Sequence, residues 1–270
     1  MDGVSPLISV DELAATLGGH HVCDIRWDLT DRSKGRANHE DGHIPGAVFV
    51  DLDEDLSTQP GAGGRHPLPP IEVFVSTLGS LGIDPDTSVV VYDDTAGQIA
   101  ARMWWMLRSI GHERVRLLDG GYQAWVAGGK EIAVGAVTPR PARYPVRNGY
   151  RGVATRDQLA GRTVIDARAP ERYRGEFEPV DPKAGHIPKA VNIPSGRNLG
   201  GDGRFLDATR LEEIYAGIPS DAVVSCGSGV TACHDALALV LASDEMPDVY
   251  VGSFSEWSTL DLPVVTGPNP

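Results

Sequence analysis

Residues 222–241 read AVVSCGSGVTACHDALALVL and are the most informative stretch of the chain. Its first residues, small and β-branched, predict a short buried strand, and the residues from 232 onward predict a helix. Cys226 therefore lies at a strand-to-helix turn and is followed by a glycine-rich loop. Such a turn directs backbone N–H groups and the helix N-terminus toward one point, where they stabilise a thiolate. We expect a reactive cysteine; the alternative, a buried structural cysteine, is disfavoured by the glycines on either side of Ser228.

Composition and charge limit the kind of protein that the chain can be. Its 270 residues are enough for one large domain or two ordinary ones. The net charge of -13 argues against a nucleic-acid or anionic-membrane partner, and no apolar run reaches membrane-spanning length. Residues 1–17 lack the basic and apolar regions of a secretory signal, and three cysteines cannot form a disulfide framework. We therefore expect a cytoplasmic protein.

The chain carries the same pattern twice. Each half has a helix-capping pattern, an Asp-x-Arg triplet and a Gly-His-Ile-Pro motif, in the same order and at similar spacing. The copies begin at Ser9, Asp24 and Gly42 in the first half and at Thr155, Asp166 and Gly185 in the second half. Strand-like runs also alternate with helix-like segments, as in residues 88–93 and 99–110. This alternation predicts mainly parallel sheets that are covered by helices on both faces.

The organisation that follows is an α/β protein with two tandem domains, each a mainly parallel central sheet flanked by helices. We expect the first domain at residues 1–133 and the second at residues 152–270, which is the usual domain size. Residues 134–151 are rich in proline and lack a helical period, so we expect them to form the linker.

With the Asp-Gly-Gly turn at residues 119–121, the tandem pattern resembles the two-domain rhodanese sulfurtransferases over about residues 7–265. The resemblance implies two tandem rhodanese-like domains. The Cys-Gly-Ser-Gly-Val-Thr loop that begins at Cys226 is similar to that of 3-mercaptopyruvate sulfurtransferases, whereas thiosulfate-preferring members usually have two basic residues after the cysteine. The resemblance also implies that the first domain is inactive, because Asp93 stands there where Cys226 stands in the second half, and a carboxylate cannot carry sulfur.

The activity that this resemblance implies is that of an EC 2.8.1 sulfurtransferase. The Cys226 thiolate would take sulfane sulfur from a small anionic donor, with 3-mercaptopyruvate favoured and thiosulfate as the alternative. The resulting persulfide would pass its sulfur to cyanide, a thiol or a thioredoxin-like protein, so that one difficult step becomes two easier ones. No cofactor, metal, nucleic-acid partner or membrane partner is expected.

The resemblance assigns roles to individual residues. The expected catalytic residues are Cys226, Ser228, His66 and Asp53. The last three would form a relay that protonates the leaving enolate of the donor. The expected donor-binding residues are Arg172, Gly227, Gly229, Val230 and Thr231. An arginine fork binds a carboxylate or a sulfonate with two hydrogen bonds.

Simpler roles stay open for three of these side chains. Ser228 would otherwise only stabilise its own loop, and His66 would be a surface loop residue. Arg172 would otherwise form a surface ion pair with one of the nearby glutamates. Those glutamates are Glu171, Glu176 and Glu178.

One position departs from the mercaptopyruvate pattern. Members that use this donor usually carry a second arginine directly after a Glu-Pro pair, where this chain has Val180. The departure weakens the assignment of mercaptopyruvate as the preferred donor. Arg174 and Lys183 are the candidates in the sequence for replacing the missing cation.

Two other functional classes share part of the pattern. Cysteine phosphatases use a similar anion-binding loop, but they carry an arginine at the position that Ala232 occupies here. A non-catalytic sulfur-relay or binding protein would have lost its nucleophile, whereas Cys226 and its loop are intact.

Of the other candidate ligands, His43 and His186 are expected to bond nearby backbone in each domain. Cys233 is expected to pack in the core, with a redox role as the alternative.

Overall fold

The structure, a computed structural model, describes residues 5–269. The chain forms two compact units. The first unit comprises residues up to 57 together with residues 69–150 and 201–204. The second unit comprises residues 58–68 and 151–200 together with residues from 205 onward. Segment 58–68 thus comes from the first half of the sequence but belongs to the second unit, and this places His66 in the same unit as Cys226.

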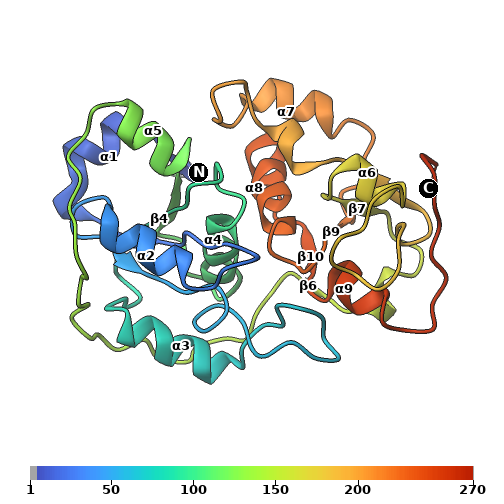
Figure 1. Cartoon of the computed structure of the whole chain (residues 1–270), viewed down its shortest axis with the longest axis horizontal. Helices are drawn as coiled ribbons and strands as arrows, with labels where there is room; N and C mark the ends of the chain where they lie inside the picture. The colour runs from blue at the N-terminus through green and yellow to red at the C-terminus, as the bar shows by residue number, and fades with distance from the viewer. Residues whose placement is uncertain (1–4, 270) are drawn as a thin grey trace. The chain divides into compact units, whose positions relative to one another are not determined.

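The first unit is built around a five-stranded sheet (Figure 1). Its strands are β1 (Leu7–Ile8), β2 (His21–Asp24), β3 (Val48–Phe49), β4 (Val89–Tyr92) and β5 (Val115–Leu118). Its α-helices are α1 (Val10–Thr16), α2 (Lys34–Asp41), α3 (Ile71–Ser80), α4 (Ala100–Ser109) and α5 (Gly121–Ala127), and a 3-10 helix, η1, covers Leu17–Gly19. The strand order is β1-β5-β4-β2-β3, with parallel neighbours throughout.

The second unit is built in the same way. Its strands are β6 (Val153–Ala154), β7 (Val164–Asp166), β8 (Ala190–Asn192), β9 (Val223–Ser225) and β10 (Asp248–Tyr250). Its α-helices are α6 (Pro170–Tyr173), α7 (Ala208–Ile214), α8 (Ala232–Ser243) and α9 (Ser253–Trp257), and its 3-10 helices are η2 (Arg156–Leu159) and η3 (Ser195–Asn198). The strand order is β6-β10-β9-β7-β8, again parallel throughout. Figure 1 shows α8 beside α7 in this unit.

The two sheets have the same strand order when each strand is replaced by its counterpart in the sequence repeat. The predicted fold class, two α/β domains in tandem with parallel central sheets, is therefore confirmed. The predicted strand at 222–225 is β9, and the predicted helix from 232 is α8. β4 and β9 are the central strands and are fully buried, which explains why their sequences are continuously apolar instead of alternating. The loops that follow them lie at the carboxyl edge of each sheet, where α/β proteins usually bind ligands.

The repeated Asp-x-Arg triplet forms a matching buried ion pair in each unit. In the first unit, Arg26 Nη2 lies 2.6 Å from Asp24 Oδ2 and donates to the Gly42 carbonyl at 2.7 Å. In the second unit, Arg168 Nη2 lies 2.7 Å from Asp166 Oδ2 and donates to the Gly185 carbonyl at 2.7 Å. Each arginine therefore ties the end of a central-sheet strand to its own Gly-His-Ile-Pro motif.

The histidines of that motif are structural, as the repeat predicts. His43 Nδ1 bonds the His39 carbonyl and His186 Nδ1 bonds the Tyr173 carbonyl, each at 2.8 Å. Both histidines are buried. No group of side chains within residues 5–269 is suited to hold a metal ion. In the same range, no helix combines the length and apolar character of a membrane span.

Candidate active site

Cys226 follows β9 directly, and its loop is fixed on both sides. The Gly229 N–H donates to Cys226 Sγ at 3.1 Å, so a backbone amide of the loop points at the sulfur. The Cys226 N–H donates to Ser253 Oγ at 3.1 Å, and its carbonyl accepts from the Phe254 N–H at 3.0 Å. The cysteine is 3 % exposed. The sulfur is thus held in the loop between β9 and α8, with a backbone amide directed at it.

Glycine is required at one position of this loop. Gly229 has a φ of +76°, and a Cβ at this position would lie 2.3 Å from the Val251 carbonyl oxygen. A backbone oxygen cannot move away as a flexible side chain can. The glycine therefore permits the turn that directs its N–H at the sulfur. Of the other predicted loop residues, Val230 is buried, and Thr231 immediately precedes α8.

His66 and Ser228 lie together in the second unit, although 162 positions separate them in the sequence. His66 Nδ1 is 2.8 Å from Ser228 Oγ, and both residues are buried. The segment that carries His66 is anchored to α9, because the Arg65 N–H donates to Ser255 Oγ at 3.0 Å. Gly64 allows this contact, since a Cβ on it would lie 2.7 Å from the Gly252 carbonyl oxygen. The structure thus supplies the hydrogen bond that a relay between these two side chains needs.

Asp53, the third residue of the expected relay, belongs to the first unit. The Trp27 indole N–H donates to Asp53 Oδ2 at 3.0 Å. The carboxylate therefore has a defined partner inside its own unit, and its part in the relay stays a prediction.

Arg172, at the end of α6, forms the ion pair that the sequence leaves open, and its donor-binding role stays a prediction. Its Nη2 lies 2.7 Å from Glu178 Oε1 and 2.9 Å from Asp181 Oδ2, so the ion pair with a nearby glutamate is present. Its Nη1 lies 3.4 Å from the point that a Cβ on Gly227 would occupy. The guanidinium is therefore paired with carboxylates and borders the space that a side chain on Gly227 would occupy.

Arg65 is the residue that sequence reasoning missed. Its Nη1 lies 2.5 Å from Asp181 Oδ1. Its Nη2 lies 3.1 Å from the point that a Cβ on Gly227 would occupy, so it borders the same space as Arg172. The only signal in the sequence is that Arg65 precedes His66, whose role depends on a contact between distant segments. Arg174 and Lys183, the candidates from the sequence, are engaged elsewhere. Arg174 pairs with Glu176 at 2.7 Å, and Lys183 Nζ donates to the Leu260 carbonyl at 2.5 Å.

The carboxylates of this cluster are buried. The Glu178 side chain is 3 % exposed and the Asp181 side chain 1 %. Burial opposes ionisation of Glu178, but the Arg172 hydrogen bond and the backbone N–H groups of Asp181 and Val180 outweigh it and lower the pKa of Glu178. Glu178 is therefore a fixed negative charge that holds Arg172 in place.

Cys233 packs in the core, as expected. It is fully buried and its Sγ donates to the Gly229 carbonyl at 3.3 Å. This bond supports the same residue whose N–H points at Cys226 Sγ. The contact gives Cys233 a structural role in the loop.

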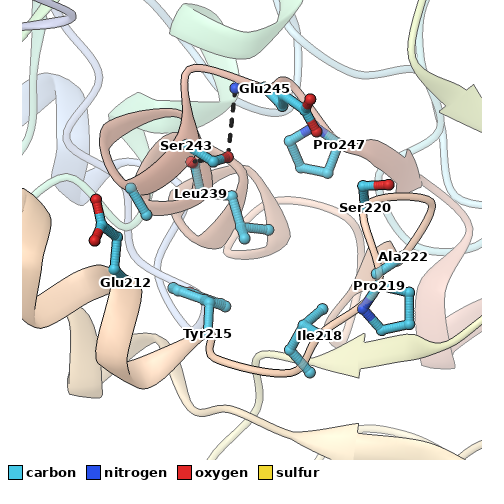
Figure 2. A pocket seen from close by; sticks show the side chains of 11 residues that line it. Glu212, Tyr215, Ile218, Pro219, Ser220, Ala222, Leu239, Ser243, Glu245 and Pro247 are labelled. Atoms are coloured by element: carbon cyan, nitrogen blue, oxygen red, sulfur yellow. Dashed lines mark hydrogen bonds between the residues drawn. The ribbon is translucent and has the colours of Figure 1, made fainter.

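A separate cavity of about 220 Å³ lies elsewhere in the second unit (Figure 2). It is formed by α7, α8 and the turns that follow them, with Tyr215, Ile218 and Leu239 among its apolar walls. The charged residues that line it, Glu212 and Glu245, are both acidic. An anionic sulfur donor would be repelled there, so the cysteine loop is the better candidate site.

Comparison with known proteins agrees with this site. Residues 9–128 and 154–260 each match the rhodanese-like domain family. A Pseudomonas aeruginosa protein named "Probable 3-mercaptopyruvate sulfurtransferase" is 43% identical over 97% of this chain and 98% of its own length. A Mycobacterium tuberculosis protein named "Putative thiosulfate sulfurtransferase SseB" is 42% identical over 94% of each chain.

A solved structure leads to the same family. SseA from Escherichia coli, described as a 3-mercaptopyruvate sulfotransferase with the rhodanese fold, superposes with a TM-score of 0.80 at 30% identity. The match covers 94% of this chain and 100% of SseA. The chain therefore belongs to the rhodanese family and is a sulfurtransferase with two rhodanese-like domains in tandem.

Proposed function

We propose that this sulfurtransferase takes its sulfur from 3-mercaptopyruvate and carries it as a persulfide on Cys226. The observation on which the proposal rests is the position of Cys226 Sγ, which accepts the Gly229 N–H at 3.1 Å. Next to it, the space that a side chain on Gly227 would fill is bordered by two guanidinium groups, those of Arg65 and Arg172. The nucleophile and the cations for an anionic donor are thus adjacent. The name of the Pseudomonas aeruginosa relative supports the same donor.

The first half-reaction breaks the carbon–sulfur bond of the donor. The Cys226 thiolate attacks the donor sulfur, a sulfur–sulfur bond forms, and the bonding electrons leave with the carbon as the pyruvate enolate. Ser228, hydrogen-bonded to His66, supplies the proton that converts this enolate into pyruvate. We include Asp53 in the relay on the resemblance alone.

The second half-reaction restores the enzyme. A nucleophilic acceptor attacks the outer sulfur of the persulfide, the sulfur–sulfur bond breaks, and its electrons return to Cys226 as a thiolate. We propose cyanide, a small thiol or a thioredoxin-like protein as the acceptor. We also propose a cytoplasmic location without a nucleic-acid or membrane partner, in line with the net charge of -13 and the three free cysteines.

We propose that transfer is confined to residues 152–270 and that residues 1–133, joined through 134–151, do not carry sulfur. The support is Asp93, which directly follows β4 as Cys226 directly follows β9.

Thiosulfate is the second candidate donor, and two observations favour it. Val180 stands where mercaptopyruvate enzymes carry an arginine, and the Mycobacterium tuberculosis relative is named for thiosulfate. Sulfite leaves thiosulfate without needing a proton, so this donor makes no use of the His66–Ser228 pair. The presence of that buried pair therefore favours mercaptopyruvate.

The test compares both donors on the purified protein. We expect intact-mass analysis to show the gain of one sulfur atom with either donor and none in Cys226→Ser. We expect kcat/KM for 3-mercaptopyruvate to be at least as high as for thiosulfate. A clear preference for thiosulfate would overturn the donor assignment, and the absence of a persulfide with both donors would overturn the site.

A further inference from the structure

Two arginines from distant segments meet over the cysteine loop. Arg172 comes from the end of α6 and Arg65 from segment 58–68. Their nearest nitrogen atoms, Arg172 Nη1 and Arg65 Nη2, lie 3.4 and 3.1 Å from the Cβ position of Gly227. Gly227 follows the nucleophile directly, and its lack of a side chain leaves this space open. Two planar cationic forks therefore face one small site next to Cys226.

Asp181 fixes both arginines with a single carboxylate. Its Oδ1 lies 2.5 Å from Arg65 Nη1 and its Oδ2 lies 2.9 Å from Arg172 Nη2. The carboxylate is 1 % exposed, whereas the Arg65 and Arg172 side chains are 23 % and 20 % exposed. The negative charge is thus buried, while the guanidinium groups keep an accessible surface. Asp181 also offsets the repulsion between two like charges at close range.

The protein leaves part of both guanidinium groups unused. Within residues 5–269, Arg65 Nη2 and Arg172 Nη1 make no hydrogen bond. Arg65 Nε, which is buried, also lacks a hydrogen-bond partner in this range. Buried donors are normally satisfied, and an unpaired donor beside a nucleophile indicates a place for a ligand oxygen.

We propose that Arg65 binds the anionic end of the sulfur donor together with Arg172, and that Asp181 is the residue that positions this pair. Arg65 thereby supplies the cation that the sequence lacks at Val180. It reaches the site from a segment that no pattern around the Glu-Pro pair reveals. The carboxylate of 3-mercaptopyruvate, which an arginine fork can bind with two hydrogen bonds, fits this pair. The inference rests on the proposed function, since it concerns the donor of the same cysteine.

The main test is Arg65→Met, which keeps much of the side-chain volume and removes the charge. Because a charge-assisted fork is lost, we expect kcat/KM for 3-mercaptopyruvate to fall roughly 10- to 100-fold, mostly through a higher KM. Discharge of a preformed persulfide to dithiothreitol, an uncharged thiol, should stay within about 2-fold of the wild type. Arg174→Met is the matched control, because Arg174 pairs with Glu176 on the surface, and its kinetics should be unchanged.

Folding is controlled with a second substitution and with thermal unfolding. Arg65→Lys keeps the charge without the fork, so we expect it to fold like the wild type and to show an intermediate rise in KM. If Arg65→Met does not fold, the KM of Arg65→Lys decides whether Arg65 binds the donor. An unchanged KM in a folded Arg65 variant would overturn the inference, and so would equal losses in donor use and persulfide discharge. Failure of the wild type to form a persulfide would instead overturn the proposed function.

Asp181→Asn tests the positioning role. We expect it to raise the KM for 3-mercaptopyruvate, because neither arginine is then fixed by a shared charge. The effects of Asp181→Asn and Arg65→Met should overlap in the double variant, since both act through the same guanidinium. Fully additive effects in a double-mutant cycle would show that Asp181 does not act through Arg65.

Discussion

The loops that follow β4 and β9 occupy the same place in the two units, yet they begin with different residues. The Asp93 carboxylate and the Cys226 sulfur also accept different numbers of backbone N–H groups. In the first unit, the Asp93 carboxylate accepts the backbone N–H groups of Thr95, Gly97, Ile99 and Ala100, each at 2.8 Å. In the second unit, Cys226 Sγ accepts the Gly229 N–H at 3.1 Å. The first loop is thus filled by an anion of its own, whereas the second holds an atom that can react.

The backbone around both residues is otherwise alike. The Asp93 carbonyl accepts the Tyr122 N–H at 2.8 Å, and the Cys226 carbonyl accepts the Phe254 N–H at 3.0 Å. One strand-loop-helix framework therefore serves two purposes, and the residue at the end of the central strand decides which. The Asp93 carboxylate accepts four backbone amides of its loop, whereas the Cys226 sulfur accepts one and is the atom that we propose to carry sulfur.

The largest expected effect is a loss of activity that occurs when the second loop is changed but not when the first loop is changed. We expect Cys226→Ser to lower kcat/KM by at least about 1000-fold, because a serine cannot carry sulfane sulfur. Asp93→Ala should leave transfer largely intact when it is assayed well below its unfolding temperature. Steady-state kinetics with both donors would measure this. Comparable losses in the two variants would mean that both domains take part in the chemistry.

The second prediction compares the glycines of the loops. Gly229→Ala should destabilise the protein by about 4 kcal/mol, because a left-handed φ of +76° is combined with a Cβ that lies 2.3 Å from a backbone oxygen. Gly97 has a φ of +88°, but its Cβ would meet only the Leu117 side chain, at 3.0 Å. Gly97→Ala should therefore cost about 1–2 kcal/mol. Urea unfolding measures both, and equal losses would contradict the difference in backbone packing.

The third prediction concerns the carboxylate that fills the first loop. Asp93→Ala leaves four N–H groups without their acceptor, and we expect the free energy of unfolding to fall by about 3 kcal/mol. Asp94→Ala is the matched control. Burial and the neighbouring Asp93 raise the pKa of Asp94, so removal of this carboxyl should cost less. Similar unfolding midpoints for the two variants would show that Asp93 is not the structural anion of its loop.

The fourth prediction tests Ser228 as the proton donor for the leaving enolate, a role that we propose for the second loop alone. Ser228→Ala should lower kcat/KM for 3-mercaptopyruvate roughly 10-fold or more, because the leaving enolate loses its acid. Thiosulfate should be used almost as before, since sulfite leaves without a proton. If the ratio of kcat/KM for 3-mercaptopyruvate to kcat/KM for thiosulfate were the same in Ser228→Ala and in the wild type, Ser228 would have only a structural role in its loop.

The smallest effect is a pH dependence of stability that comes from the arginine cluster of the second unit. The pKa of Glu178 is lowered in the folded protein from 4.5, so its contribution is fully present above about pH 4.5. It is lost as the pH falls through the lowered pKa, because the unfolded chain then binds the proton more tightly. Thermal unfolding between pH 7 and pH 3 should show this loss, and Glu178→Gln should reduce it. An identical pH profile in that variant would assign the loss to other carboxyl groups.

Much of the molecule could be predicted from local sequence. The apolar run before Cys226 and the small residues after it predict β9, the loop and α8, because these elements depend on hydrogen bonds between near neighbours. The repeat predicts that Asp93 and Cys226 are counterparts, and the matched backbone bonds agree. It also predicts the structural histidines, whose partners lie in their own unit.

The composition of the donor site could not be predicted in the same way. The sequence points to Arg174 and Lys183 near Val180, but chain proximity does not decide where a long side chain ends. Arg174 pairs on the surface and Lys183 caps backbone carbonyls. Arg65 is found only through its ion pair with a residue 116 positions away.

The fold could be read from the sequence alone, which also predicts a single reactive cysteine and an inactive counterpart at Asp93. Hydrophobic periodicity, glycine turns and an internal repeat are all local or repeated signals. The folded chain adds the ion pair of Arg65 with Asp181, 116 positions away, which the sequence did not suggest. It also supplies the contact of His66 with Ser228, 162 positions away, which was expected from the family resemblance alone. These contacts depend on the packing of segment 58–68 into the second unit, and no local preference of the chain encodes that packing.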